Sequence, residues 1–238
     1  MALHHSPRIV TSGLEMYIDP ADPNCYPGSG LSFTDLSTNG WATNIDYSSE
    51  LSIAGTPAYI SNTGNGGSYR FSNSPYINWA TTSFTFSAWG YRNNLSDDRQ
   101  GRMFDMTNAG NGHLRLTLAG TCTLRFRPTA GGGNILLSGG TASAGMWHNL
   151  TVTKSGNTSG GPANYTLYLD GVEVDSNTSS ALVTDSNFTV IRIMKSADDD
   201  QPTISWDGKF GPFMVYTRDL TAAEVLENYE AQKTRFGL

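Results

Sequence analysis

Two carboxylates stand at the spacing that places both side chains on one face of a strand. Glu173 and Asp175 flank Val174, directly after an Asp-Gly turn. Retaining glycosidases use two carboxylates about 5 Å apart, but two solvated strand carboxylates would show the same pattern. No serine nucleophile elbow is present, and no triad or zinc spacing joins the four histidines, His4, His5, His113 and His148. The sequence therefore predicts no enzyme and no catalytic residue.

Acidic runs offer the only candidate metal ligands. The chain carries Asp97-Asp98, then three aspartates at 198–200 with Asp207 nearby. Calcium needs several oxygen ligands, and three adjacent aspartates cannot all face one ion. Asp198, Asp200 and Asp207 are therefore candidate Ca²⁺ ligands, with a solvated acidic loop as the alternative.

Aromatic and arginine side chains form two candidate binding sets. Sugar sites pair aromatic platforms with polar groups, commonly on loops. The irregular region 20–66 holds the first set, Tyr26, Trp41, Tyr47 and Tyr59. The second set occupies strand positions whose side chains should alternate away from the core, so its members could line one polar sheet face: Trp89, Tyr91, Arg115, Arg125 and Arg127. Arginines and aromatics are also enriched at protein interfaces, so this face could bind a protein neighbour or a glycan. Trp89 could also pack internally.

The elements that carry these residues are mostly short strands separated by turn signals. Region 20–66 is mostly turn chemistry. The predicted strands are 14–19, 68–71, 76–79, 84–91, 101–106, 113–119, 122–127, 134–137, 147–153, 165–171, 172–175, 188–194 and 209–216. Asp170-Gly171 predicts a tight type I′ hairpin turn. Such a series indicates one all-β sandwich domain of two antiparallel sheets.

One helix is predicted, over 221–235, at the C-terminal end. Thr221 and Glu224 form a capping box. Leu220 and Val225 form a hydrophobic staple. Ala222, Val225, Leu226 and Tyr229 recur at helical spacing and are the expected packing face. Gly237 supplies the stop.

Composition excludes several function classes. The chain has 238 residues, a net charge of -6 and only 15% charged residues, which argues against a nucleic-acid surface. No apolar run reaches the length of a membrane span, and the first residues lack the pattern of a secretory signal.

Cys25 and Cys122 are predicted to be buried thiols, with a disulfide as the alternative. We therefore expect synthesis in a reducing cytoplasm. Residues 1–12 are predicted to be a polar arm before a domain over 13–238.

Four segments resemble a known family in their order and spacing. They are SFTFSAWGYR (83–92), MWHNLTVTKSG (146–156), NYTLYLDGVEVDS (164–176) and GKFGPFMVYTRDLTAAEVL (208–226). Together they resemble the laminin-G-like branch of the concanavalin A-like lectin/glucanase superfamily, over about residues 12 to 236. The opening 9–40 and the closing 220–238 are similar to those of lectin-like structural proteins of tailed bacteriophages.

The resemblance implies a jelly-roll fold and a role in a virion. It implies a non-enzymatic structural protein on a capsid, neck, tail or fibre of a bacteriophage, held by other virion proteins as a homo-oligomer or in many symmetry-related copies. The alternative is a carbohydrate-binding host-recognition module at a fibre tip. Relatives often hold Ca²⁺ at the sandwich rim, but the acidic positions of the family are replaced here by 71–74 and by Gly211-Pro212. The glucanases use three alternating acids, and this chain has two.

Overall fold

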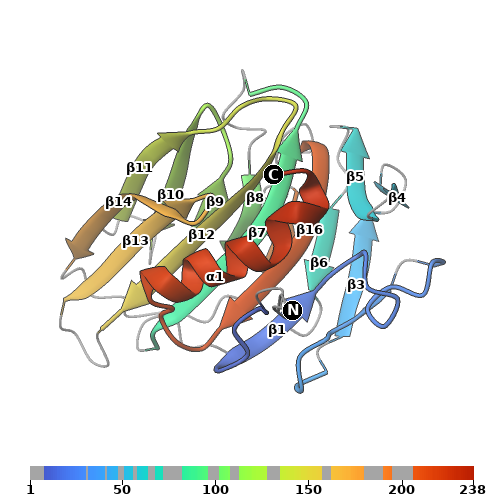
Figure 1. Ribbon diagram of the computed structural model, residues 1–238, viewed down its shortest axis with the longest axis horizontal. Helices are drawn as coiled ribbons and strands as arrows, with labels where there is room; N and C mark the ends of the chain where they lie inside the picture. Colours follow the sequence, from blue (N-terminus) through green and yellow to red (C-terminus); the bar gives the residue numbers. More distant parts are fainter. Residues whose placement is uncertain are drawn as a thin grey trace, which may run out of the picture.

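Two antiparallel β-sheets pack face to face, and one helix lies across the outside of the first (Figure 1). The computed structural model describes residues 8–30, 32–40, 42–47, 51–55, 58–63, 68–71, 82–95, 102–107, 113–127, 135–156, 162–179, 190–194 and 206–238. The predicted strand at 76–79 lies outside these residues. The predicted fold class, a two-sheet antiparallel jelly-roll sandwich with one C-terminal helix, is confirmed.

The first sheet has the strand order β14-β13-β12-β7-β16-β5-β4, and β1 also pairs with β16. Its strands are β1 (Leu14–Ile18), β4 (Leu51–Ala54), β5 (Tyr59–Thr63), β7 (Phe84–Arg92), β12 (Trp147–Ser155), β13 (Ala163–Leu169), β14 (Val172–Ser179) and β16 (Asp207–Tyr216). Asp170 and Gly171 join β13 to β14 with φ of 52° and 79°. These two positive values fit the expected type I′ turn.

The second sheet has the order β11-β10-β9-β8-β15-β6-β3-β2. Its strands are β2 (Phe33–Thr34), β3 (Ala42–Tyr47), β6 (Ser68–Phe71), β8 (Arg102–Thr107), β9 (His113–Thr117), β10 (Thr121–Arg127), β11 (Ile135–Thr141) and β15 (Val190–Ile193). Four strands, β2 to β5, lie in the region predicted to be mostly turns. Their sequences mix strand formers with the Ser, Asn and Asp residues that favour turns. Pairing with β6 and β16 supplies hydrogen bonds that keep β3 and β5 extended.

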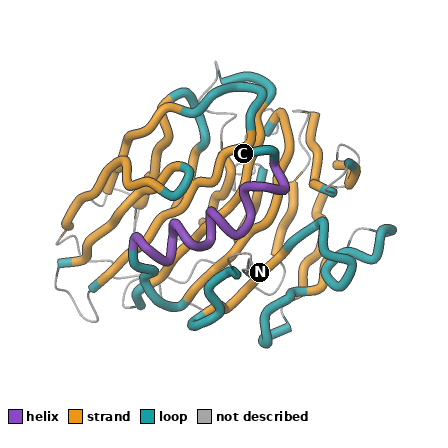
Figure 2. Tube along the Cα trace, in the orientation of Figure 1, coloured by secondary structure: helices purple, strands orange, loops and turns teal. Residues whose placement is uncertain are grey.

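The main core lies between the two sheets. Phe86 on β7 contacts Phe104 on β8 and Phe213 on β16, with ring centroids 4.6 and 6.2 Å apart. Cys25 and Cys122 are both buried and free, so the prediction of buried thiols is confirmed. The opposite face of β7 points outward and is covered by the helix (Figure 2).

The helix α1 (Ala222–Lys233) continues into a 3₁₀ turn, η2 (Thr234–Phe236). The predicted Thr221–Glu224 capping box is present, and Gly237 ends the helix with φ of 78°. The predicted packing face is wrong in part. The buried residues of the helix are Val225, Asn228 and Gln232, whereas Leu226, predicted to be on the packing face, is 43% exposed.

The helix is thus rotated about its axis relative to the prediction, and the hydrogen bonds of a buried amide side chain, that of Asn228, explain why. Asn228 Oδ1 accepts from the backbone N–H of Val10 at 2.8 Å, and Asn228 Nδ2 donates to the Tyr216 hydroxyl at 3.1 Å. The Tyr216 hydroxyl in turn donates to the carbonyl of Val10 at 2.9 Å. Within the predicted arm, residues 8–12 are thus described and lie against the chain's own helix, and residues 1–7 lie outside the described residues.

Candidate functional site: an arginine and threonine hollow

The outer face of the second sheet carries polar side chains because strand residues alternate between faces. On β9, Leu114 and Leu116 point into the core and are at most 1% exposed, while Arg115, which is 9% exposed, and Thr117 lie on the outer face. On β10, Leu124 is buried and Arg125 is exposed. The apolar positions fix the register, and the register in turn places the polar set on one surface.

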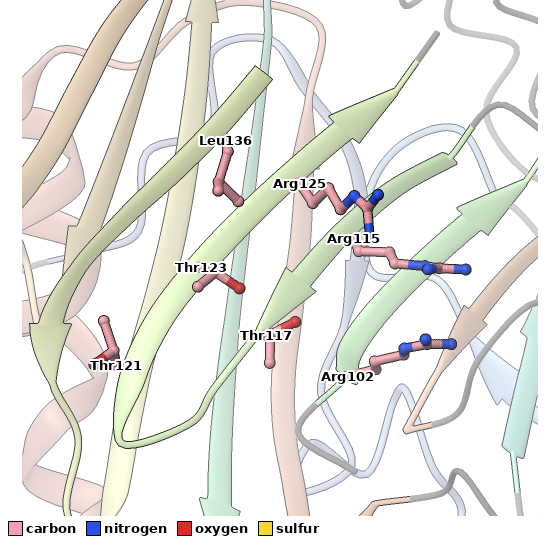
Figure 3. Close-up of a pocket in the computed structure, with 7 residues that line it drawn as sticks. All are labelled: Arg102, Arg115, Thr117, Thr121, Thr123, Arg125 and Leu136. Atoms are coloured by element: carbon pink, nitrogen blue, oxygen red, sulfur yellow. The ribbon is translucent and has the colours of Figure 1, made fainter. Parts of the chain in front are cut away.

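A shallow hollow of about 210 Å³ lies on this face, over β8 to β11. Figure 3 shows the guanidinium groups of its arginines together at one end, with threonines beside them. The lining consists of three arginines, three threonines and one leucine: Arg102, Arg115, Arg125, Thr117, Thr121, Thr123 and Leu136. Arginine and hydroxyl groups at this density can hydrogen-bond a polar ligand.

Strand register sets the spacing within the hollow, which we name the arginine hollow. Arg125 lies directly opposite Arg115, and Thr123 lies opposite Thr117. Residues opposite each other have Cβ atoms about 4.5–5.5 Å apart. The hollow therefore has a row of cations and, one pleat away, a row of hydroxyls.

One buried carboxylate lies beside the arginines, on the same face of the sheet. Asp105 on β8 is opposite Arg115 and is fully buried. Its Oδ2 accepts from Arg115 Nε at 2.9 Å and lies 3.5 Å from Arg102 Nη1. Arg125 makes no ion pair with any residue that the structure describes. Asp105 thus fixes Arg115, and Arg125 remains available for a ligand.

The second predicted set does not form one face, so that expectation is wrong. Arg115 and Arg125 lie on the second sheet, whereas Trp89 and Tyr91 lie on β7 of the first. Alternation identifies the face of a strand and not the sheet to which the strand belongs. The side chain of Arg127 lies outside the described residues; its backbone pairs with His113.

Trp89 is buried beneath the helix and cannot contact a ligand. It has no exposed surface, and its Nε1 donates to Gln232 Oε1 at 2.7 Å. Its ring stacks on Tyr229 with centroids 5.4 Å apart and contacts Phe236 at 4.5 Å. Trp89 therefore anchors the helix.

Tyr59 and Tyr91, predicted for different surfaces, lie in one half-buried cluster. The ammonium of Lys209 lies 4.6 Å from the ring centroid of Tyr59 and 4.4 Å from that of Tyr91. Trp147 makes edge contacts with both rings. This cluster lies on the first sheet, away from the arginine hollow.

The remaining aromatic candidates are dispersed. Tyr26 lines a separate hollow with prolines of the 20–28 segment, and its ring contacts Phe33 with centroids 5.3 Å apart. Trp41 and the side chain of Tyr47 lie outside the described residues.

The candidate metal ligands are not assembled in the described part of the chain. Asp198 and Asp200 lie outside it. Asp207 Oδ1 accepts from Asn93 Nδ2 at 2.7 Å. Among the described residues no group of three His, Cys, Asp or Glu side chains could hold a metal ion.

The two candidate catalytic carboxylates point to different faces. A β-bulge at Val174 places Glu173 opposite Tyr168 and Asp175 opposite Leu167, which are successive residues of β13. Asp175 accepts from the backbone N–H groups of Ser138 and Ser176 at 2.7 and 2.8 Å. The alternation that suggested a glycosidase pair is broken, and Asp175 instead joins β14 to β11.

Sequence reasoning missed several lining residues. Arg102, Leu136 and the three threonines carry no motif of their own. One feature of the sequence could have identified two of them: Thr117 and Thr123 alternate in step with Arg115 and Arg125 and therefore lie on the same face of their strands.

No helix among the described residues is long and apolar enough to cross a membrane.

Several solved structures have the same fold. Domain 4 of AbnA, a GH43 extracellular arabinanase from Geobacillus stearothermophilus, in complex with arabinotriose, has 16% identity and a TM-score of 0.64, over 92% of this chain and 98% of that one. The binding domain of Paraclostridial Mosquitocidal Protein 1 has 20% identity and a TM-score of 0.64, over 92% of this chain.

A structure of botulinum neurotoxin type C, described as dependent on two ganglioside molecules for cell entry, has 12% identity and a TM-score of 0.68, over 93% of this chain. The chain spans about half of both toxin chains, 52% in each case.

No curated protein sequence matches the chain. The family model described as the concanavalin A-like lectin/glucanases superfamily matches residues 63–226. That range covers more than half of the chain and agrees with the two-sheet sandwich. The chain therefore belongs to the concanavalin A-like lectin/glucanases superfamily.

Proposed function

We propose that this chain is a non-catalytic carbohydrate-binding domain whose ligand occupies the arginine hollow. The observation that carries the proposal is the hollow itself, where arginines and threonines project from adjacent strands beside an exposed Leu136 (Figure 3). Sugar ligands need several hydrogen-bonding groups together with some apolar contact. The arabinanase domain, which is similar over nearly its whole length and is in complex with arabinotriose, supports this ligand class.

The non-catalytic part of the proposal has separate support. Glu173 and Asp175 point to different faces of β14. Among the described residues, the one carboxylate that contacts the arginines of the hollow is Asp105, which is fully buried and paired with Arg115. Retaining and inverting glycosidases both need two accessible carboxyl groups at the scissile bond.

A double substitution of the hydroxyl row tests the proposed site. Thr117→Val with Thr123→Val should weaken binding to glycans selected from an array by about tenfold or more, because each lost hydrogen bond contributes about 1 kcal/mol. The measurement is the Kd by isothermal titration calorimetry. Lys233→Gln, on the helix and paired with Glu230, is the control and should bind as the parent does. Array silence, or an unchanged Kd in the double variant, would contradict the proposal.

The setting that we propose is the surface of a bacteriophage particle, with other virion proteins as partners and the chain present in many copies or as a homo-oligomer. The resemblance of the two ends of the sequence to phage structural proteins supports it. So does an exposed apolar pair on the side away from the hollow: Val172 is 63% and Leu226 43% exposed, and Leu226 lies against Gly171, next to Val172. We expect cryo-microscopy of purified particles to locate the chain with this side inward. Its absence from washed particles would contradict the setting.

A further inference from the structure

We infer that the ligand of the arginine hollow is an acidic saccharide, with its carboxylate or sulfate ester bound at the arginines and its hydroxyls at the threonines. This inference rests on the proposed function and specifies its ligand class. It also assigns Arg125 as the residue that distinguishes acidic from neutral sugars.

The charge of the hollow is opposite to that of the chain. The protein has a formal net charge of -6, yet three guanidinium groups line this one hollow. Among the described residues one carboxylate, Asp105, accompanies them; it lies opposite Arg115 on the same face of the sheet and is fully buried. A neutral ligand that covered the hollow would remove water from these cations without supplying a counter-charge, which is costly.

The arrangement of the arginines is suited to an anion. Arg115 and Arg125 are directly opposite each other on β9 and β10, and like charges in that position are destabilising. The Asp105 carboxylate holds Arg115 through Nε at 2.9 Å, so this guanidinium is oriented before a ligand arrives. A carboxylate or sulfate between Arg115 and Arg125 would relieve their repulsion and form charge-assisted hydrogen bonds with both.

The rest of the lining favours a saccharide over other anions. Thr117 and Thr123 follow the arginines along the hollow, Thr121 lies at the end away from the guanidinium groups, and Leu136 is 55% exposed (Figure 3). A sugar acid presents an anionic group, hydroxyls and an apolar ring face together, as this lining requires. A nucleic acid or an anionic membrane needs an extended basic surface, and an acidic chain disfavours both.

The test compares matched acidic and neutral ligands. A glycan array would carry uronate, sialylated and sulfated glycans beside the same glycans after methyl esterification, desialylation or desulfation, and the Kd of each bound pair would be measured at 50 and 300 mM salt. We expect the acidic member to bind at least tenfold more tightly, with a preference that falls as salt rises. Arg125→Gln should remove that preference by weakening the binding of the acidic member at least tenfold. Arg125 is exposed, so the variant is expected to fold.

The outcomes separate this inference from the function on which it rests. Equal binding of acidic and neutral members would overturn the inference and leave the carbohydrate site standing. Silence toward every glycan would overturn both. Tighter binding to a single-stranded oligonucleotide or to phosphatidylserine vesicles than to any acidic glycan would overturn the saccharide assignment. The Lys233→Gln variant, which removes one positive charge outside the hollow, should keep the preference for acidic glycans; its loss there would mean that net charge alone causes it.

Discussion

Replacing Arg235 with methionine should lower the free energy of unfolding by about 3 kcal/mol. Arg235, just after α1, binds both oxygens of Asp19, Nη1 to Oδ2 at 2.7 Å and Nη2 to Oδ1 at 2.5 Å. Asp19 is only 3% exposed, and removing one partner of a buried pair costs about 3–5 kcal/mol. We expect the lower end because Asp19 keeps hydrogen bonds from the Tyr17 hydroxyl and the backbone N–H of Ala21.

Urea denaturation followed by circular dichroism would measure this loss. The double variant Asp19→Asn with Arg235→Met should lose less than Arg235→Met alone, because no buried charge is then left without its partner. Lys233→Met, which removes a cation at the helix surface two residues away, should leave the midpoint unchanged. A loss below about 1 kcal/mol in Arg235→Met would show that water replaces the guanidinium.

The variant Trp89→Ala should lose about 3–5 kcal/mol, as is typical when a buried tryptophan is truncated. Trp89 is fully buried and contacts the helix through Tyr229, Phe236 and the Gln232 amide. Its loss would leave a cavity between β7 and α1 and would leave Gln232 Oε1 without its donor. The helix should therefore detach before the sandwich unfolds.

Hydrogen exchange would distinguish helix detachment from general unfolding. In Trp89→Ala, amides of α1 should lose protection while amides of β9 and β10 keep theirs. Trp89→Phe keeps most of the apolar contact and should cost less. Glycan binding should survive in both variants, because the arginine hollow lies on the other sheet. Equal loss of protection in both sheets would refute the anchoring role of Trp89.

Local signals in the sequence predicted the local structure well. The Thr221–Glu224 capping box and the Asp170-Gly171 turn depend on residues that are close in the chain, and both are present. The helix packing face was predicted from apolar spacing and is rotated, because Asn228 and Gln232 are buried. Their partners, Val10 and Trp89, are 218 and 143 residues away in the chain, so no local pattern indicates this burial.

The candidate site was predicted only in part for a related reason. Alternation correctly separated Arg115 and Arg125 from the buried leucines, but it could not tell that Trp89 and Tyr91 belong to the other sheet. The β-bulge at Val174 likewise places the side chains of Glu173 and Asp175 on different faces of the strand. A bulge of one inserted residue leaves no signature in the sequence pattern.

Hydrogen bonds hold the first described residues on the side of the molecule that carries the helix. The backbone N–H of Val10 donates to Asn228, and the carbonyl of Ser12 accepts from Arg218 Nε at 2.8 Å, so the first described residues lie on the helix side of the molecule (Figure 1). The arginine hollow opens on the opposite side. If the domain is held through its helix side, the hollow faces outward, and in the many-copy setting proposed above its weak glycan contacts would add up to avidity.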